Sequence, residues 1–449
     1  MHSRTQGQRP LRPARSFVTC LRDFLTPQLW KQAHAARNSC RSSRWYTQPL
    51  VLTLLLLTYC QGDAVAERFA IARAYCVVCL PQRRRPGRTA GGFHKALARL
   101  PMPVLRVVAA GIRRVLASRL SQRWQEGGFI GFGCDGARLE CPRAEELEQR
   151  LGCAGKKDSA PTLWLTALVH LQLGLPWAWR WGKGTASERH HLLQLLPLLP
   201  AAALVVADAG YFGLRLAYAL AGAAVAFLLR MSSLVTRYTT QHVRLERFRE
   251  GLVYYWPKKA HKAGQRPLLL RLIRIRGRKR PYDVWLLTNV LERRRLSAAA
   301  AGQWYRRRWE SAGLFRTYKR TLKKVKLVSR TVRLVHREAE GSLLATQLLL
   351  ALGVLALRRG ARSGEAKGCS PRKVLLAVRA EMGVRLRRGQ RRFYQQLQQA
   401  ERERRQRRSA KEKREWPRRK GHQPPKPPKI LKLTKKQKVL LSQLECEEA

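Results

Sequence analysis

The sequence has 449 residues, with 90 Lys and Arg against 28 Asp and Glu, so its formal net charge is +62. The positive excess runs along the whole chain and repels itself, which predicts a polyanionic partner: nucleic acid first, with an anionic membrane surface as the weaker alternative. An apolar content of 45% excludes a merely disordered basic protein and, at this length, allows two or three domains.

Residues 1–125 are basic and mostly helical in pattern, and the Pro- and Gly-rich segment 81–92 predicts a loop within them. We interpret this region as a helical DNA-binding region. It contains the apolar run 50–59, LVLTLLLLTY, which is about half the roughly 20 residues needed to span a bilayer. The run therefore predicts a buried helix.

Ten cysteines are present, and we find no secretory signal before them, which favours a reducing compartment and free thiols. Cys76 and Cys79 form a lone CxxC. A zinc site needs a second pair of Cys or His at a suitable distance, and none follows.

Short apolar runs bounded by Gly and Pro begin near residue 126. Their order over residues 126–231 is three strands, a helix, a strand, a helix and a strand, which is typical of a ribonuclease H-like fold. Residues 232–296 predict a β-rich insertion, and residues 297–385 predict helices that complete an α/β core with a mixed sheet. The basic, low-complexity residues 386–449 predict a disordered arm.

A second leucine-rich run, residues 342–357, is short for a membrane span and carries Ser, Thr and Gln. We expect a buried helix packed under the sheet.

Two aspartates follow apolar strands. Asp135 closes the run FIGFGCD and precedes Gly136, and Asp208 closes ALVVA and precedes Ala209 and Gly210. Buried neighbours would fix such carboxylates, and glycine would let a substrate approach. Each Asp alone is more often a turn residue, so the residues leave a turn and a metal ligand both open.

Residues 305–319, YRRRWESAGLFRTYK, predict one helix that begins after Ser297. On such a helix Arg308, Ala312 and Lys319 share one stripe, which would face the sheet. Glu310 points about 200° away from position 312, so it is not expected to replace a carboxylate there.

The basic residues of this segment suit phosphate groups. Tyr305, Arg308 and Lys319 are candidate DNA contacts, and Lys323 and Lys324 would extend them along the backbone without sequence preference. A solvated basic face is the alternative, and it is the favoured interpretation for residues 306, 307 and 316.

Four segments combine into a resemblance: residues 134–143, 175–192, 205–213 and 305–331. In content, order and spacing they resemble the insertion-sequence-four family of DDE transposases, most closely its planctomycete-type subgroup, over residues 45–385. That family's signature is Tyr, two residues, Arg, three residues, Glu, six residues and Lys. Tyr305, Arg308 and Lys319 fall in register, and Ala312 stands where the family has its catalytic Glu.

The resemblance implies that Asp135 and Asp208 are catalytic aspartates that bind Mg²⁺, with two ions expected and Mn²⁺ able to substitute. The implied activity is cleavage at the ends of a transposable element followed by strand transfer. The implied partners are terminal inverted repeats and target DNA, with a homodimer in the DNA complex, at the bacterial nucleoid in the cytoplasm and without a membrane.

Ala312 leaves a second reading, a catalytically inactive DNA-binding transposase derivative. A basic RNA-binding or ribosome-associated protein stands further behind, because it has no need of Asp135, Asp208 and the Tyr-Arg-Lys spacing together.

Overall fold

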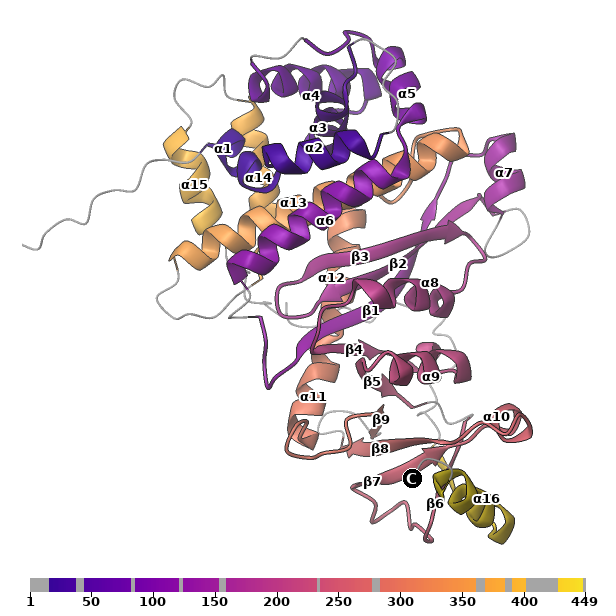
Figure 1. Ribbon diagram of the computed structural model, residues 1–449. Coiled ribbons are helices and arrows are strands. Elements are labelled where there is room, and N and C mark those ends of the chain that lie inside the picture. The colour runs from indigo at the N-terminus through magenta and orange to yellow at the C-terminus, as the bar shows by residue number, and fades with distance from the viewer. Residues whose placement is uncertain are drawn as a thin grey trace, which may run out of the picture. The chain divides into compact units, whose positions relative to one another are not determined.

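The protein has two compact units, one built from residues 1–119 with 337–402 and one from residues 120–336 with 403–449. We call them the helical unit and the sheet unit (Figure 1). The computed structural model describes residues 16–37, 44–81, 85–120, 124–152, 159–231, 235–276, 283–360, 368–383, 390–400 and 427–446.

The helical unit confirms the helical pattern expected for the first region. Its helices are α1 (Phe17–Phe24), α2 (Pro27–Ala35), α3 (Thr47–Tyr59), α4 (Val65–Cys79), α5 (Ala90–Arg99), α6 (Met102–Leu120), most of α13 (Val332–Gly360), α14 (Pro371–Gly383) and α15 (Gln390–Gln398). Hydroxyl caps start several of them; Ser16, Thr26 and Thr89, for example, each accept a hydrogen bond from a backbone N–H of the first turn.

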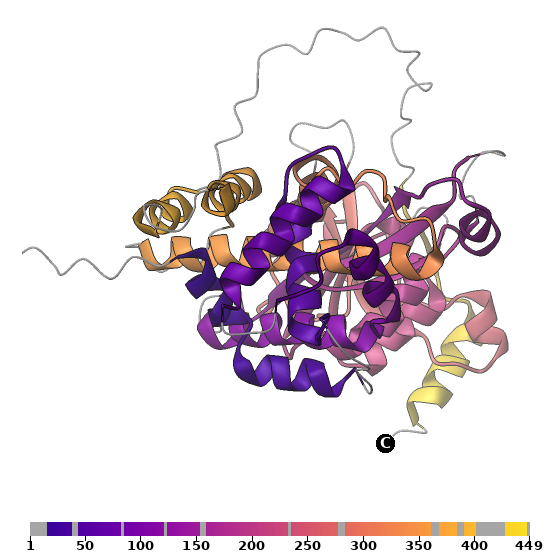
Figure 2. The ribbon, with the colours of Figure 1, turned by 90° about the horizontal axis from the view of Figure 1, so that it is seen from above.

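Two apolar helices form the core of this unit. Helix α3 is apolar all round and almost wholly buried, as predicted for residues 50–59. Its Tyr59 hydroxyl donates to the carbonyl oxygen of Ala345 at 2.7 Å. Helix α13, the long orange helix of Figure 2, therefore packs on α3, so residues 342–357 form a buried helix of this unit. Among the described helices, Val332–Leu357 is long and apolar enough to cross a membrane, but its apolar window is fully buried in the protein.

The sheet unit contains one ten-stranded mixed sheet with the order β10-β6-β7-β8-β9-β5-β4-β1-β2-β3. The strands are β1 (Ile130–Glu140), β2 (Thr162–His170), β3 (Leu175–Lys183), β4 (Ala203–Ala207), β5 (Ala226–Arg230), β6 (Thr236–Thr239), β7 (Glu250–Tyr255), β8 (Leu268–Ile275), β9 (Val284–Thr288) and β10 (Lys429–Lys432). Strands β1, β2 and β3 are antiparallel neighbours, and β4 and β5 continue parallel to β1. This arrangement confirms the mixed α/β, ribonuclease H-like class.

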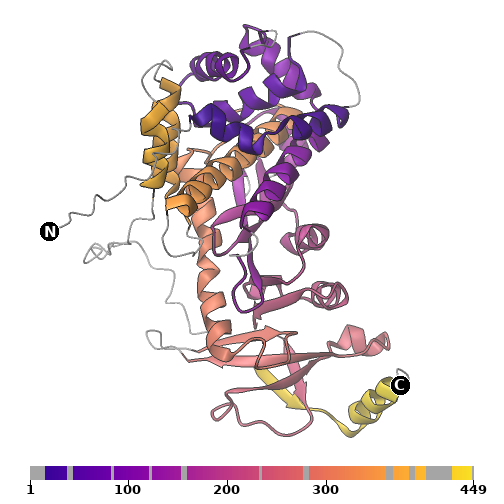
Figure 3. The same ribbon diagram turned by 60° about the vertical axis from the view of Figure 1, so that its left-hand side comes forward.

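Helices cover both faces of this sheet. They are α7 (Glu145–Leu151), α8 (Glu188–Leu195), α9 (Leu214–Gly222), α10 (Lys258–Lys262), α11 (Ala298–Arg307), α12 (Trp309–Arg316) and α16 (Lys435–Cys446). Figure 3 shows α11 and α12 on one face and α8 and α9 on the other. The two faces matter for the candidate site, because side chains reach it from both.

The strands of residues 232–296 extend the main sheet. Strand β9 pairs antiparallel with β5, where Leu228 faces Thr288, so β5 joins the two halves of the sheet. Because the β5 edge of the core was still open, the added strands could continue its hydrogen-bond ladder.

The expectation of a disordered arm over residues 386–449 is wrong in part. Strand β10 pairs in parallel with β6, and Leu433 and Leu441 bury their side chains in a cluster with Trp256. A few apolar residues thus order a segment whose overall composition is basic and of low complexity. Residues 401–426 of the expected arm lie outside the described residues.

Candidate active site

Strands β1 and β4 bring Asp135 and Asp208 together. They pair in parallel from Ile130 opposite Ala203 to Gly133 opposite Val206, and continuing this register by two residues places Asp135 beside Asp208. Asp208 follows the last residue of β4, as predicted. Asp135 does not end its strand, because β2 pairs with β1 as far as Glu140.

Backbone N–H groups orient both carboxylates. The N–H of Gly136 donates to Oδ1 of Asp135 at 2.9 Å, and the N–H of Gly210 donates to Oδ1 of Asp208 at 2.9 Å. Asp208 thereby caps the short 3₁₀ helix η3 (Ala209–Tyr211). The turn interpretation thus describes part of what Asp208 does, and in both residues the hydrogen bond uses the same carboxylate oxygen, Oδ1.

The electrostatics of the pair are unfavourable without a cation. Burial raises the pKa of Asp135, and the nearby Asp208 carboxylate raises it further. The Gly136 hydrogen bond and the Arg308 guanidinium act in the opposite direction and lower this pKa. Two carboxylates in a partly desolvated place therefore repel each other, and a positive charge between them would relieve this repulsion.

Glycines on β1 let α11 and α12 lie close to one face of the sheet. A Cβ added at Gly131 would lie 2.1 Å from the ring of Trp304, and one at Gly133 would lie 2.2 Å from Oγ of Ser311. Side chains of a strand alternate between its faces, so Asp135 points to the same face as these two glycines. This is the face on which Arg308 acts on Asp135.

The predicted continuous helix over residues 305–319 is broken at Arg308. Helix α11 ends at Arg307 and α12 begins at Trp309, and the N–H of Arg308 donates to Tyr305 instead of to a residue four positions back. A π-helical turn, η4 (Thr317–Thr321), then contains Lys319. Such irregular turns within helices often mark functional positions.

Arg308 lies among aromatic rings at this break. Its guanidinium lies 5.4 Å from the Tyr305 ring and 4.9 Å from the Trp309 ring. Its Nε is buried, and it has no hydrogen-bond partner within the described part of the chain. Arg308 thus offers an unused donor beside Asp135, whereas Tyr305 packs against the apolar core of the unit.

The three lysines of the predicted DNA contacts follow the helix break. Burial lowers the pKa of Lys319, which is half-buried. Lys323 is exposed and has a φ of +53°, and the N–H of Lys324 donates to the carbonyl oxygen of Tyr318 at 3.1 Å. The irregular backbone presents Lys323 to solvent directly after η4.

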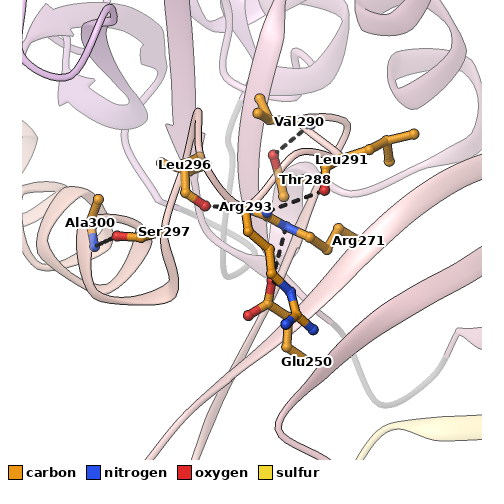
Figure 4. Close-up of polar contacts among 9 residues, drawn as sticks. All are labelled: Glu250, Arg271, Thr288, Val290, Leu291, Arg293, Leu296, Ser297 and Ala300. Carbon is orange, nitrogen blue, oxygen red and sulfur yellow. Dashed lines mark hydrogen bonds and ion pairs between the residues drawn. The ribbon is translucent and has the colours of Figure 1, made fainter.

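A buried arginine anchors the loop that leads into α11 (Figure 4). Arg271 of β8 donates to the carbonyl oxygens of Leu291 and Leu296, and its Nε lies 3.5 Å from Glu250. Glu250 also pairs with Arg293 at 3.2 Å. The Arg271 side chain is only 2% exposed. The sequence LLLRLIRIR reads as a basic strand, and nothing in it indicates that this arginine is buried and bonded within the protein.

Sequence reasoning missed Glu188, the first residue of α8. A Cβ added at Gly136 would lie 2.1 Å from Oε1 of Glu188, so this carboxylate rests on the backbone next to Asp135. In the sequence, Ser187 and Glu188 form an ordinary helix cap followed by an acidic first-turn residue. This common pattern explains Glu188 by itself, so the sequence gives no signal of a further role.

The donor set at this site suits Mg²⁺, which takes hard oxygen ligands and keeps several waters. Two carboxylates meet there, and the buried Tyr211 hydroxyl lies nearby, beside Cys134 and Glu188, without a well-formed hydrogen bond to either. No group of three His, Cys, Asp or Glu in the described ranges already has a metal-binding arrangement. The same holds around Cys76 and Cys79, which are buried and form no disulfide, as is true of the other five described cysteines.

Residues 135–348 match the family model described as the transposase DDE domain. This match supports a DDE-type DNA transposase. No protein of curated function matches the chain. A cryo-EM structure of the piggyBac transposase synaptic complex with hairpin DNA is similar in fold at a TM-score of 0.41 and 11% identity, covering 86% of this chain and 85% of that one. So distant a likeness says nothing about individual residues.

Proposed function

We propose that the chain is a DNA transposase that uses Mg²⁺ to cut the ends of a transposable element and to join them to target DNA. The observation that carries this proposal is the meeting of Asp135 and Asp208 on adjacent parallel strands, with Arg308 beside them. The match of residues 135–348 to a transposase DDE domain supports it, and so does the net charge of +62.

In this mechanism Asp135 and Asp208 would hold the cation. Bound there, Mg²⁺ would supply activation of the attacking oxygen and charge neutralisation at the leaving oxygen. The buried Nε of Arg308 would donate to the scissile phosphate, because a guanidinium among aromatic rings is held in a fixed orientation. Arg308 would thus place the phosphate against the two carboxylates.

The basic residues that follow would bind the DNA backbone. Lys319, Lys323 and Lys324 lie in and after η4, and Tyr305 lies before the break at Arg308. Phosphate contacts of this kind position a duplex and carry no sequence information. The terminal inverted repeats would be recognised elsewhere, and the basic helical N-terminal region is our candidate.

The finer assignment follows the sequence resemblance. We propose a member of the insertion-sequence-four family that acts as a homodimer on DNA of the bacterial nucleoid. Ala312 supports a second candidate, an inactive derivative that occupies element ends without cutting them.

A cleavage assay decides between these functions. The substrate is a supercoiled plasmid that carries the inverted repeats flanking the gene, incubated with Mg²⁺ or with a chelator. Asp135→Asn and Asp208→Asn should abolish Mg²⁺-dependent cleavage, whereas Asp63→Asn, the same change at an exposed position of the helical unit, should leave it intact. If the unmodified protein binds the substrate but does not cleave it, the protein is the inactive derivative. If both aspartate variants cleave as well as the unmodified protein, the proposed site is refuted.

A further inference from the structure

Helix α8 places a carboxylate near the two aspartates, on the face of the sheet opposite to the one that α12 covers. Glu188 is its first residue, after the cap Ser187. The helix is seated firmly on the sheet, because His191 Nδ1 lies 2.9 Å from the Thr166 hydroxyl. A Cβ added at Gly182 would also lie 2.7 Å from the His191 ring. The position of Glu188 is thus set by buried contacts one turn further along α8.

The backbone of β1 makes room for this carboxylate. A Cβ at Gly136 would lie 2.1 Å from Oε1 and 2.8 Å from Cδ of Glu188. Only a glycine at position 136 lets the carboxylate occupy this place. Gly136 is also the residue whose N–H orients Asp135, so the two carboxylates share one backbone unit.

The same helix is tied to the turn that holds Asp208. Arg189, the next residue after Glu188, donates from Nε to the carbonyl oxygen of Gly210 at 2.7 Å. The N–H of Gly210 is the donor to Asp208. Burial raises the pKa of Glu188, the Asp135 and Asp208 carboxylates raise it further, and the Tyr211 hydroxyl and the Arg138 guanidinium act in the opposite direction.

A buried hydroxyl is an independent sign of a ligand here. The Tyr211 side chain is 1% exposed, and its hydroxyl lies beside Glu188 and Cys134. Its contacts with Glu188 and Cys134 lower the pKa of both groups, but neither contact has well-formed hydrogen-bond geometry. A buried hydroxyl whose hydrogen bonds are poorly formed is costly, so a group that turns toward Tyr211 would gain a stronger hydrogen bond.

We propose that Glu188 is the third carboxylate of a divalent-cation site with Asp135 and Asp208, in place of the one that position 312 lacks. The inference rests on the proposed function, because it assigns a further ligand to the same site. Glu188 has three rotatable bonds and must turn when the ion binds, since the three carboxylates are not yet in metal-binding geometry. Tyr211 would then orient the carboxylate as an outer hydrogen-bond donor.

Titration with Mn²⁺ alone, followed by calorimetry and by the loss of the free-ion paramagnetic signal, tests this assignment without any measurement of cleavage. Glu188→Gln should weaken Mn²⁺ binding by about tenfold or more. Glu310→Gln is the matched control, with the same change on α12, and should stay within about twofold. Adding Ala312→Glu to Glu188→Gln should recover part of the affinity, because it supplies a carboxylate from the other face.

The outcomes separate the two proposals. Unchanged affinity in Glu188→Gln together with weakened binding in Asp135→Asn would overturn the role of Glu188 and leave the proposed function standing. Unchanged affinity in both variants would overturn the cation site as a whole. If Glu188→Gln does not fold, Glu188→Asp keeps the charge with a shorter reach; an unchanged Mn²⁺ affinity in that variant would count against the proposal, and a several-fold loss would support it.

Discussion

The substitution Gly136→Ala moves the Glu188 carboxylate from its place but leaves the glutamate side chain and its charge unchanged. The added Cβ would lie 2.1 Å from Oε1, whereas ordinary contacts begin near 3.4 Å, so the carboxylate must retreat by more than 1 Å. The end of a flexible, half-exposed side chain can make this shift cheaply, and the Trp164 indole, 3.1 Å from the added Cβ, must move by only a few tenths of an ångström. The stability cost of the contact is therefore small and is offset by about 0.4–1 kcal/mol, because alanine restricts the unfolded chain.

The expected result is a protein of nearly unchanged stability that binds Mn²⁺ about tenfold more weakly, which corresponds to about 1.4 kcal/mol. Thermal unfolding without metal and calorimetric Mn²⁺ titration measure the two quantities. Gly302→Ala on α11 is the control, because its Cβ would make only an ordinary 3.4 Å contact with Ile275. Unchanged Mn²⁺ affinity in a stable Gly136→Ala protein would show that the place occupied by Glu188 has no part in cation binding.

Three further predictions concern the anchor, the charge of Asp135 and DNA. Arg271→Ala should cost about 3–5 kcal/mol in urea denaturation, because it removes the buried donor of two carbonyl groups and leaves Glu250 with its exposed partner Arg293. Arg293→Ala, which removes that exposed partner, should cost less than about 1 kcal/mol, and equal losses would contradict the anchor. Burial raises the pKa of Asp135 in the folded protein above its value in the unfolded chain. Protonation of Asp135 therefore stabilises the folded state fully below the unfolded pKa, and this stabilisation is lost as the pH rises through the folded pKa. Metal-free Asp135→Asn should therefore have a higher Tm than the unmodified protein near neutrality, and a gap that persists in acid would count against this reasoning. Duplex affinity should fall by about 10³–10⁵-fold between about 50 and 200 mM salt if 6–10 phosphates are contacted, and a flat filter-binding profile would exclude the polyanion argument.

The core strands were predictable because each is a short apolar run bounded by Gly or Pro. Strand β4, residues ALVVA, has all five residues buried and ends before Asp208 as the pattern predicts. The end of β1 was not predictable. Whether a strand continues past an Asp-Gly pair depends on its neighbour, and β2 is more than twenty residues away along the chain.

Site residues could be predicted from the sequence only where a local pattern, such as an aspartate after an apolar strand, distinguishes them. Asp135 and Asp208 stand out at strand ends, whereas Glu188 follows a helix cap and is marked only by its tertiary contact with Gly136. The break at Arg308 also escapes the sequence, because spacing along a segment does not show where hydrogen bonds shift from four residues to three. Contacts across elements decide both features.

The pairing of β10 with β6 means that residues 236–239 gain this neighbouring strand only after residues 429–432 have been synthesised. During translation β6 is therefore an open edge, and open edges invite pairing with strands of other chains. Arg237 of β6 is fully buried, with its guanidinium 4.5 Å from the Phe212 ring and 4.6 Å from the Tyr255 ring. An inward-pointing cation is a known protection of such edges, so the nascent protein carries its own safeguard against aggregation until β10 arrives.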